Sequence, residues 1–273
     1  MPLLPFAQLD FPGATALGGG RYVVRTVEDA PPDVLALRIL GAPRAASRLR
    51  RGRPVALDSE PDATPLPLSR VTLVKSTAFD DDAAAAAWLA EVAGDDEMTA
   101  GLSAETCRTL NRAIQAHRVA APDAYAADLH PAAAVAVRFG YGTGDEVAEG
   151  RWSEAFELTE AKRRGLRSAL IDGVGAQERV AAVLGGRDTV GAEESLLLTA
   201  ELAAAERRNG EAAIAAAAAA QTLAASPRAG AGAAEVVAAT SRLRKEALAE
   251  RQIGDQELRE TLRSLRRAVR AAR

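Results

Sequence analysis

The side chains that most often carry covalent or metal chemistry are scarce in this chain, which has one cysteine and two histidines in 273 residues. Cys107, His117 and His130 are separated by ten and thirteen residues, spacings that match no zinc-binding pattern. Cys107 and His117 fall on one predicted helix, where ten residues span about 15 Å, too far for a hydrogen bond between a nucleophile and its base. The sequence therefore predicts neither a metal site nor a Cys-His catalytic pair.

A glycine-rich stretch, FGYGTGDEVAEGRWSEAFEL at Phe139–Leu158, raises the question of a phosphate-binding loop. Its glycines alternate with other residues from Gly140 to Gly144, but a dinucleotide fingerprint needs a third glycine where Asp145 or Val147 stands. The stretch has no lysine, and Asp145 and Glu146 place negative charge where a phosphate would sit. We therefore expect a turn between two elements and no nucleotide or other cofactor.

No Gly-x-Ser-x-Gly motif is present, and the acidic runs Asp80–Asp82 and Asp95–Glu97 are typical of helix starts and turns. No pair of carboxylates is singled out for acid-base catalysis. The sequence thus favours a protein that binds other molecules over an enzyme, with an enzyme whose site follows no motif as the remaining alternative.

Two short segments resemble the turn and second-helix start of a tetratricopeptide repeat. Gly150–Ala155 puts a glycine turn and an aromatic residue before Glu-Ala, and Asn209–Ile214 repeats the glycine and Glu-Ala, with Pro227 near the place of the closing proline. The resemblance implies antiparallel helical hairpins with a surface for peptides or partner proteins. A generic helical bundle is the alternative.

Composition also favours packed helices. Hydrophobic residues make up 48% of the chain and aromatic residues only 4%, because alanine supplies much of the apolar content. Alanine buries little area, so elements must approach closely. Charge is uneven: residues 80–160 hold 16 acidic and 5 basic side chains, and residues 161–273 hold 14 acidic and 19 basic ones. An acidic middle and a basic end suggest contact between them, within or between chains, or simply solvated surfaces.

The first 79 residues differ from the rest. Arg21–Val27, Asp33–Leu40 and Ser69–Phe79 are rich in Val, Ile, Leu or Thr and are bounded by turn residues, which predicts strands of a small sheet. Between the last two lies a long polar loop in which Arg44–Arg53 contains five arginines, without aromatic residues for base stacking. A solvated charged loop is the default interpretation.

From Asp80 onward the pattern is helical. Ser103 is a candidate N-cap for a helix that places Cys107, Leu110 and Ile114 on one stripe. The run Pro122–Phe139 ends in AVAVRF, which alternates like a strand, but its alanines favour helix. Further helices are predicted at Glu157–Ile171, Ala176–Leu184, Asp188–Arg208 and Glu211–Ala225, followed by a C-terminal pair.

The last helix carries two stripes. Leu258, Leu262 and Leu265 continue into an apolar stripe, and an arginine stripe lies about 100° around the helix. That stripe consists of Arg259, Arg263, Arg266, Arg270 and Arg273. The helix can pack on its own domain, form a coiled-coil seam with another chain, or bind nucleic-acid phosphates or an anionic membrane.

We therefore expect an α+β protein with a small β-rich domain at 1–79, a larger alanine-rich helical domain of antiparallel hairpins at 80–228 and a basic helical extension at 229–273. The single cysteine, the lack of a signal peptide and the short apolar runs indicate a cytoplasmic protein without a transmembrane segment. The arginine-rich composition suggests a bacterial source.

The predicted function is that of a scaffold or adaptor that binds protein partners or itself. The alternative is a nucleic-acid-associated regulator that uses the basic C-terminal helix and the 44–53 loop. The candidate contact residues are Trp152, Phe156, Leu258, Leu262, Leu265, Arg259, Arg263, Arg266 and Arg270.

Overall fold

A computed structural model describes residues 2–13, 15–25, 31–41, 66–123, 125–159, 173–227, 229–230 and 232–272. The chain divides into two compact units, Met1–Asp172 (unit 1) and Gly173–Arg273 (unit 2). The domain boundary predicted after residue 79 thus falls inside unit 1. The arginine-rich 44–53 loop and most of the helix predicted at 157–171 lie outside the described residues.

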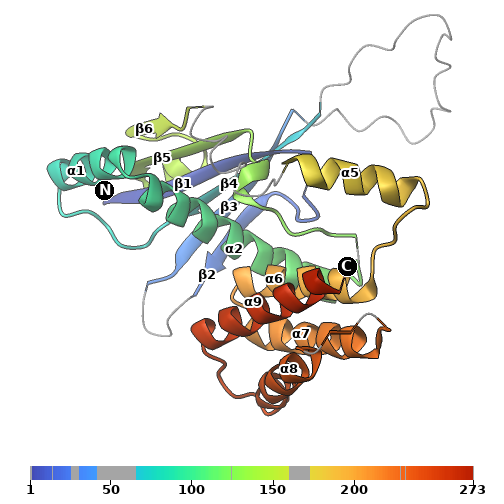
Figure 1. Cartoon of the computed structure of the whole chain (residues 1–273). Coiled ribbons are helices and arrows are strands. Elements are labelled where there is room, and N and C mark those ends of the chain that lie inside the picture. Colours follow the sequence, from blue (N-terminus) through green and yellow to red (C-terminus); the bar gives the residue numbers. More distant parts are fainter. Residues whose placement is uncertain are drawn as a thin grey trace, which may run out of the picture. The chain divides into compact units, whose positions relative to one another are not determined.

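Unit 1 is built on a six-stranded sheet with the order β2-β3-β4-β1-β5-β6, in which all neighbours are antiparallel (Figure 1). The α+β class is confirmed. The sheet is larger than the three strands predicted, because the N-terminus and two segments beyond residue 130 join it. The strands are β1 (Leu3–Pro12), β2 (Gly20–Val24), β3 (Asp33–Leu40), β4 (Leu68–Val74), β5 (Ala136–Thr143) and β6 (Glu154–Glu157).

One face of this sheet is covered by helices α1 (Asp82–Gly94) and α2 (Asp96–Ala120). Successive side chains of a strand point to opposite faces, and the odd-numbered ones of β1, β3, β4 and β5 enter the core. They meet one apolar side of each helix, which includes Val92, Leu110 and Ile114. Cys107 is buried in the same core.

The start of α2 differs from the predicted one. Asp95 is the N-cap, and its side chain accepts hydrogen bonds from the amides of Glu97 and Met98. Ser103, the predicted cap, lies inside the helix and donates to the carbonyl oxygen of Thr99 at 2.8 Å. Asp95 is the better N-cap because its side chain accepts hydrogen bonds from two amides of the first turn and its negative charge is favourable at the start of a helix.

The prediction of a helix over Pro122–Phe139 is wrong. After the short 3-10 turn η1 (Pro131–Ala133), the chain forms β5, which pairs with β1 over eight residues. The alternation of AVAVRF therefore outweighs the helix propensity of its alanines: Val137 and Phe139 enter the core, and Arg138 points to the other face.

The alternating glycines of β5 let the following segment fold back over the sheet. A side-chain carbon added at Gly140 would lie 2.3 Å from the carbonyl oxygen of Glu154 in β6. One added at Gly142 would lie 2.9 Å from Val147 in the short helix α3 (Gly144–Ala148). Close approach of backbone, and not a phosphate group, explains this motif.

Unit 2 is helical, and its core is assembled around α7. α7 has seven buried residues, which are six alanines and Leu223. It contacts α6, α8 and α9. Small side chains let three helices approach one axis, as the alanine-rich composition predicted. No helix in the described ranges combines the length and apolar character that crossing a bilayer requires. The helices are α5 (Gly173–Leu184), α6 (Ala192–Ala205), α7 (Asn209–Ala225), α8 (Ala233–Leu248) and α9 (Asp255–Ala271).

Gly140→Ala is expected to lower the free energy of unfolding of unit 1 by about 2 kcal/mol, because the added methyl group clashes with the backbone of Glu154. The control Gly101→Ala lies in α2 with nothing within 4 Å and is expected to raise stability by up to about 1 kcal/mol. Urea unfolding followed by tryptophan fluorescence reports on unit 1, because Trp88 and Trp152 are the only tryptophans. Equal effects of the two substitutions would contradict the close approach.

Candidate functional site on the polar face of the sheet

The face of the sheet that points away from α1 and α2 carries its residues in rows, because paired residues of antiparallel strands share a face. An apolar row crosses the sheet from β3 to β6 and consists of Val34, Val74, Phe6, Gly140 and Ala155. The next row consists of Ala36, Thr72, Gln8, Arg138 and Glu157. A third row consists of Arg38, Arg70 and Asp10. One end of this face is thus apolar and the other is charged.

The apolar row is covered by the segment that follows β5. Phe6, Val74 and Val147 form a buried cluster, and Trp152 packs against it with its ring centroid 5.7 Å from that of Phe6. This covering fixes the position of α3 and of the turn after it, and so determines which groups stand beside the charged rows.

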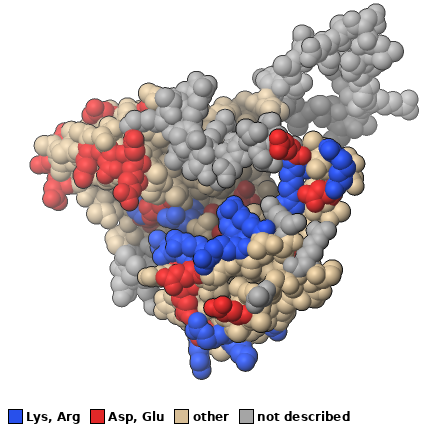
Figure 2. All heavy atoms as spheres, viewed as in Figure 1, with Lys and Arg blue, Asp and Glu red and all other residues tan. Residues whose placement is uncertain are grey.

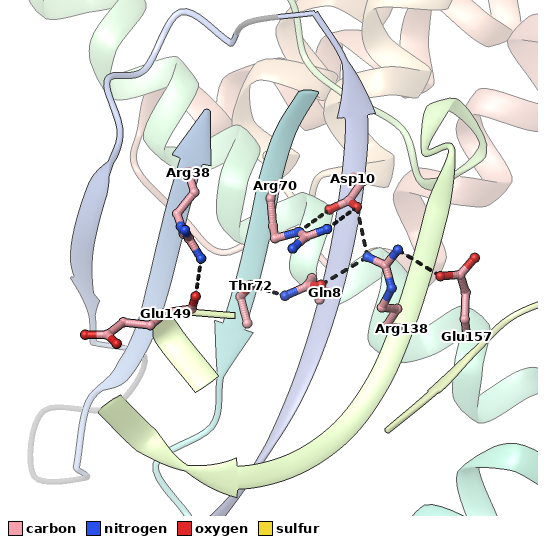
Figure 3. A network of polar contacts seen from close by, with 8 residues as sticks. All are labelled: Gln8, Asp10, Arg38, Arg70, Thr72, Arg138, Glu149 and Glu157. Carbon is pink, nitrogen blue, oxygen red and sulfur yellow. Dashed lines mark hydrogen bonds and ion pairs between the residues drawn. The ribbon is translucent and has the colours of Figure 1, made fainter. Parts of the chain in front are cut away.

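Asp10 is the centre of the charged rows (Figure 3). Its side chain is 3% exposed and accepts two hydrogen bonds of 2.8 Å from Arg70, one on each carboxylate oxygen. Arg138 donates a third, also of 2.8 Å. Because β1 lies between β4 and β5, one carboxylate links three adjacent strands. Paired, fully hydrogen-bonded charges of this kind are the form in which a buried carboxylate is tolerated.

Arg138 extends the network toward the sheet edge. It forms a 2.8 Å ion pair with Glu157 of β6 and donates to the side-chain oxygen of Gln8 at 3.1 Å. The amide nitrogen of Gln8 in turn donates to the Thr72 hydroxyl at 3.0 Å. The central polar groups of this face are therefore partnered with one another, as Figure 3 shows.

These contacts set the protonation of Asp10. Burial alone would raise its pKa, but the hydrogen bonds and charges of Arg70 and Arg138 outweigh burial and hold the pKa below its ordinary value of 3.8. Asp10 is therefore a carboxylate at neutral pH. A group so firmly ionised is poorly matched to general acid-base catalysis, which works best with a pKa near the working pH.

A second group of charges lies beside this network, at the turn after α3. Glu149 pairs with Arg151 at 2.8 Å and with Arg21 at 3.5 Å, and Arg21 also pairs with Asp145 at 2.8 Å. The Glu149 carbonyl oxygen accepts a hydrogen bond from Arg38 of β3. All four of the paired side chains are substantially exposed, so these ion pairs are weak.

In the described ranges, no group of three or more His, Cys, Asp or Glu side chains is arranged to hold a metal ion. Cys107 lies in the apolar core of unit 1. The Nδ1 atom of His130 accepts from the amide of Ala132, and burial lowers the pKa of His130. These residues support local structure.

Trp152 and Phe156, two of the contact residues suggested by sequence, pack within unit 1. Trp152 lies against Phe6, and the ring centroid of Phe156 is 5.6 Å from that of Phe139. Phe156 belongs to β6, so a strand and not a helix follows the first of the two repeat-like motifs. The second motif begins α7.

The leucines of the C-terminal helix lie inside unit 2. Leu258, Leu262 and Leu265 are buried against α6, α7 and α8. The apolar stripe therefore stabilises the unit that carries it and is not displayed on its surface. Of the three uses considered for this helix, packing on its own domain is the one observed for the leucines.

The arginines of α9 lie on the outside. Arg266 pairs with Glu201 of α6, with 2.6 Å between Nε and Oε1. Arg259, Arg263 and Arg270 are exposed, and the described residues offer them no ion pair. Figure 2 shows basic side chains gathered over α9 and acidic ones over α1.

Comparison of the chain with protein-family models, with curated proteins and with solved structures returned no match. Sequence reasoning overlooked Asp10, Arg70 and Arg138. The available signal was the polar residue at every second position of AQLDF at Ala7–Phe11, within an otherwise apolar strand.

Asp10→Asn is expected to lower the free energy of unfolding of unit 1 by about 3 kcal/mol at pH 7, because it leaves the largely buried Arg70 without a charged partner and Arg138 with Glu157 alone. The control Asp145→Asn removes an exposed carboxylate, 82% exposed, and is expected to cost less than about 0.5 kcal/mol. Denaturant titrations of the three proteins measure both effects.

The same comparison has a predicted pH dependence. Because the folded-state pKa of Asp10 lies below the unfolded value of 3.8, its ion pairs stabilise the fold above that pH and are lost as the pH falls through the folded pKa. The difference between wild type and Asp10→Asn is expected to shrink below pH 4. A difference that stays constant from pH 7 to pH 3 would contradict an ionised Asp10.

Proposed function

We propose that the protein is a non-enzymatic scaffold or adaptor that binds protein partners through unit 2. The single observation that carries this proposal is the arginine stripe of α9, in which Arg259, Arg263 and Arg270 are exposed without an ion pair in the described ranges. Their helix is held by buried leucines on its neighbouring side. The three arginines are thus a fixed array of cations that spans 11 residue steps of the helix, or about 16 Å, and is suited to an acidic partner surface.

An apolar patch adjoins the stripe. Leu198 is 63% exposed and Leu202 is 46% exposed, and they lie one turn apart on α6. Glu201, between them in sequence, pairs with Arg266 of α9, so the two helices meet at this point. A partner that combines acidic and apolar side chains would match both parts of this surface.

The helical arrangement fits this use. Three residues, 206–208, join α6 to α7, and six residues, 249–254, join α8 to α9. Connections this short favour antiparallel neighbours, so we propose two helical hairpins in unit 2. This is the arrangement that the repeat-like motif at the start of α7 implies.

A second copy of the chain is one partner with the required charge. The region around α1 and the start of α2 presents exposed acidic side chains and, from residue 80 to residue 97, has no basic residue. This surface in one molecule can attract α9 of another. These exposed acidic residues are Asp80, Asp81, Asp82, Glu91, Asp95, Asp96 and Glu97.

A nucleic-acid-associated regulator is the second candidate, and the same unpaired arginines favour it. Binding to phosphates would weaken steeply with added salt and would vary little with base sequence. Treatment of a lysate with nuclease separates the two candidates, because it removes a nucleic-acid partner and leaves a protein partner.

Replacing Arg259, Arg263 and Arg270 by glutamate is expected to weaken partner capture at least about tenfold, because charge repulsion replaces attraction. The matched control changes Arg244 and Lys245, two exposed basic residues of α8, to glutamate and is expected to bind like wild type. Each variant serves as bait in a nuclease-treated native lysate, and light scattering at low and high salt measures self-association.

Proteins captured by wild type and control but not by the α9 variant would support the proposal, as would an oligomer lost in that variant alone. Equal capture by all three baits, with equal molar masses, would contradict it. Loss of all α9-dependent capture on nuclease treatment would favour the nucleic-acid candidate instead.

A further inference from the structure

Arg38 stands out among the charges of unit 1. It is the direct cross-strand partner of Arg70, and like charges placed opposite each other destabilise a sheet. The two guanidinium groups come close, since a carbon added at Gly150 would lie 2.9 Å from one Nη1 and 3.7 Å from the other. Arg70 is neutralised by Asp10, whereas Arg38 donates only to the Glu149 carbonyl oxygen and has no carboxylate partner in the described ranges.

Arg38 differs from the other arginines of this region in its partners. Arg21, Arg70, Arg138 and Arg151 each form an ion pair with at least one carboxylate, from Asp10, Asp145, Glu149 or Glu157. Arg38 is the one arginine of this group without a carboxylate partner among the described residues.

A pocket of about 560 Å³ opens beside Arg38. Arg21 and Arg151 also line it, from β2 and from the turn after α3. Glu149, the partner that Arg21 and Arg151 share, also lines the pocket. It is 55% exposed, so an incoming anion can take over its weak ion pairs as the carboxylate turns toward solvent. Ala36 and Ala148 provide an apolar part of the lining.

We propose that this pocket binds the phosphate group of a small organic phosphate. Three guanidinium groups from three elements can surround the oxygens of one phosphate, and Arg38 supplies the unmatched charge. The volume exceeds that of the phosphate alone and lies within the usual range for small-molecule sites, so the apolar lining receives the organic part. This site lies in unit 1 and is independent of the partner surface proposed for unit 2.

Isothermal titration of the full chain with glycerol 3-phosphate and with inorganic phosphate, at pH 8 and constant ionic strength, tests this site. Saturable one-to-one binding is expected, with the organic phosphate tighter. Arg38→Gln is expected to weaken binding at least about tenfold, because it removes a charged hydrogen-bond donor. The matched control is Arg112→Gln, an exposed arginine of α2 on the other side of the sheet, and it is expected to bind like wild type.

A thermal melt establishes that Arg38→Gln is folded, which is expected because Arg38 is exposed and makes one hydrogen bond. If that variant were unfolded, Arg151→Gln, which removes a side chain that is 67% exposed, is the second variant and is expected to weaken binding as well. The proposal is overturned if wild type binds neither probe, if Arg38→Gln and Arg112→Gln lose affinity equally, or if both probes bind with one affinity. None of these results bears on α9, so failure here is distinct from failure of the proposed function.

Discussion

The polar face of unit 1 depends on one carboxylate held by two guanidinium groups. Asp10 lies on β1, which has a neighbouring strand on each side, and it binds Arg70 of β4 and Arg138 of β5. Arg70 depends on this carboxylate for its charge partner, whereas Arg138 shares it with Glu157, and both arginines are largely buried, where an unpaired cation is costly. The contact also explains why residues far apart in sequence form one sheet, since it joins the N-terminal strands to a strand that follows α2.

The two faces of the sheet are covered in different ways. On the α1 and α2 side, alternating apolar side chains form a hydrophobic core. On the other side, glycines at every second position of β5 allow α3 and β6 to approach the backbone and cover Phe6. The uncovered remainder must then be polar. Arginines therefore lie in two settings, paired and half-buried around Asp10, or exposed at the pocket beside Arg38.

Sequence reasoning succeeded where one element could be judged alone. β3 and α7 follow local periodicity, and their observed bounds lie close to the predicted Asp33–Leu40 and Glu211–Ala225. The helix start expected at Asp80–Asp82 and the two stripes of the last helix are also found, in α1 and α9. It failed where pairing with a distant strand determines the secondary structure. β1 and β5 have mixed propensities and form strands because they pair with each other in the sheet. The Asp10 network was missed for the same reason, because its members are 60 and 128 residues apart and only the register brings them together.

Unit 2 uses the opposite arrangement, with a core of alanines and leucines and with Arg259, Arg263 and Arg270 exposed, without an ion pair to any described residue. The anion site proposed for unit 1 stands on the sheet whose central strands the ionised Asp10 joins. The most direct measurement is an NMR titration of the side-chain carboxyl carbon of Asp10 in the folded chain. The account predicts a pKa below 3.8; a pKa at or above that value would contradict it.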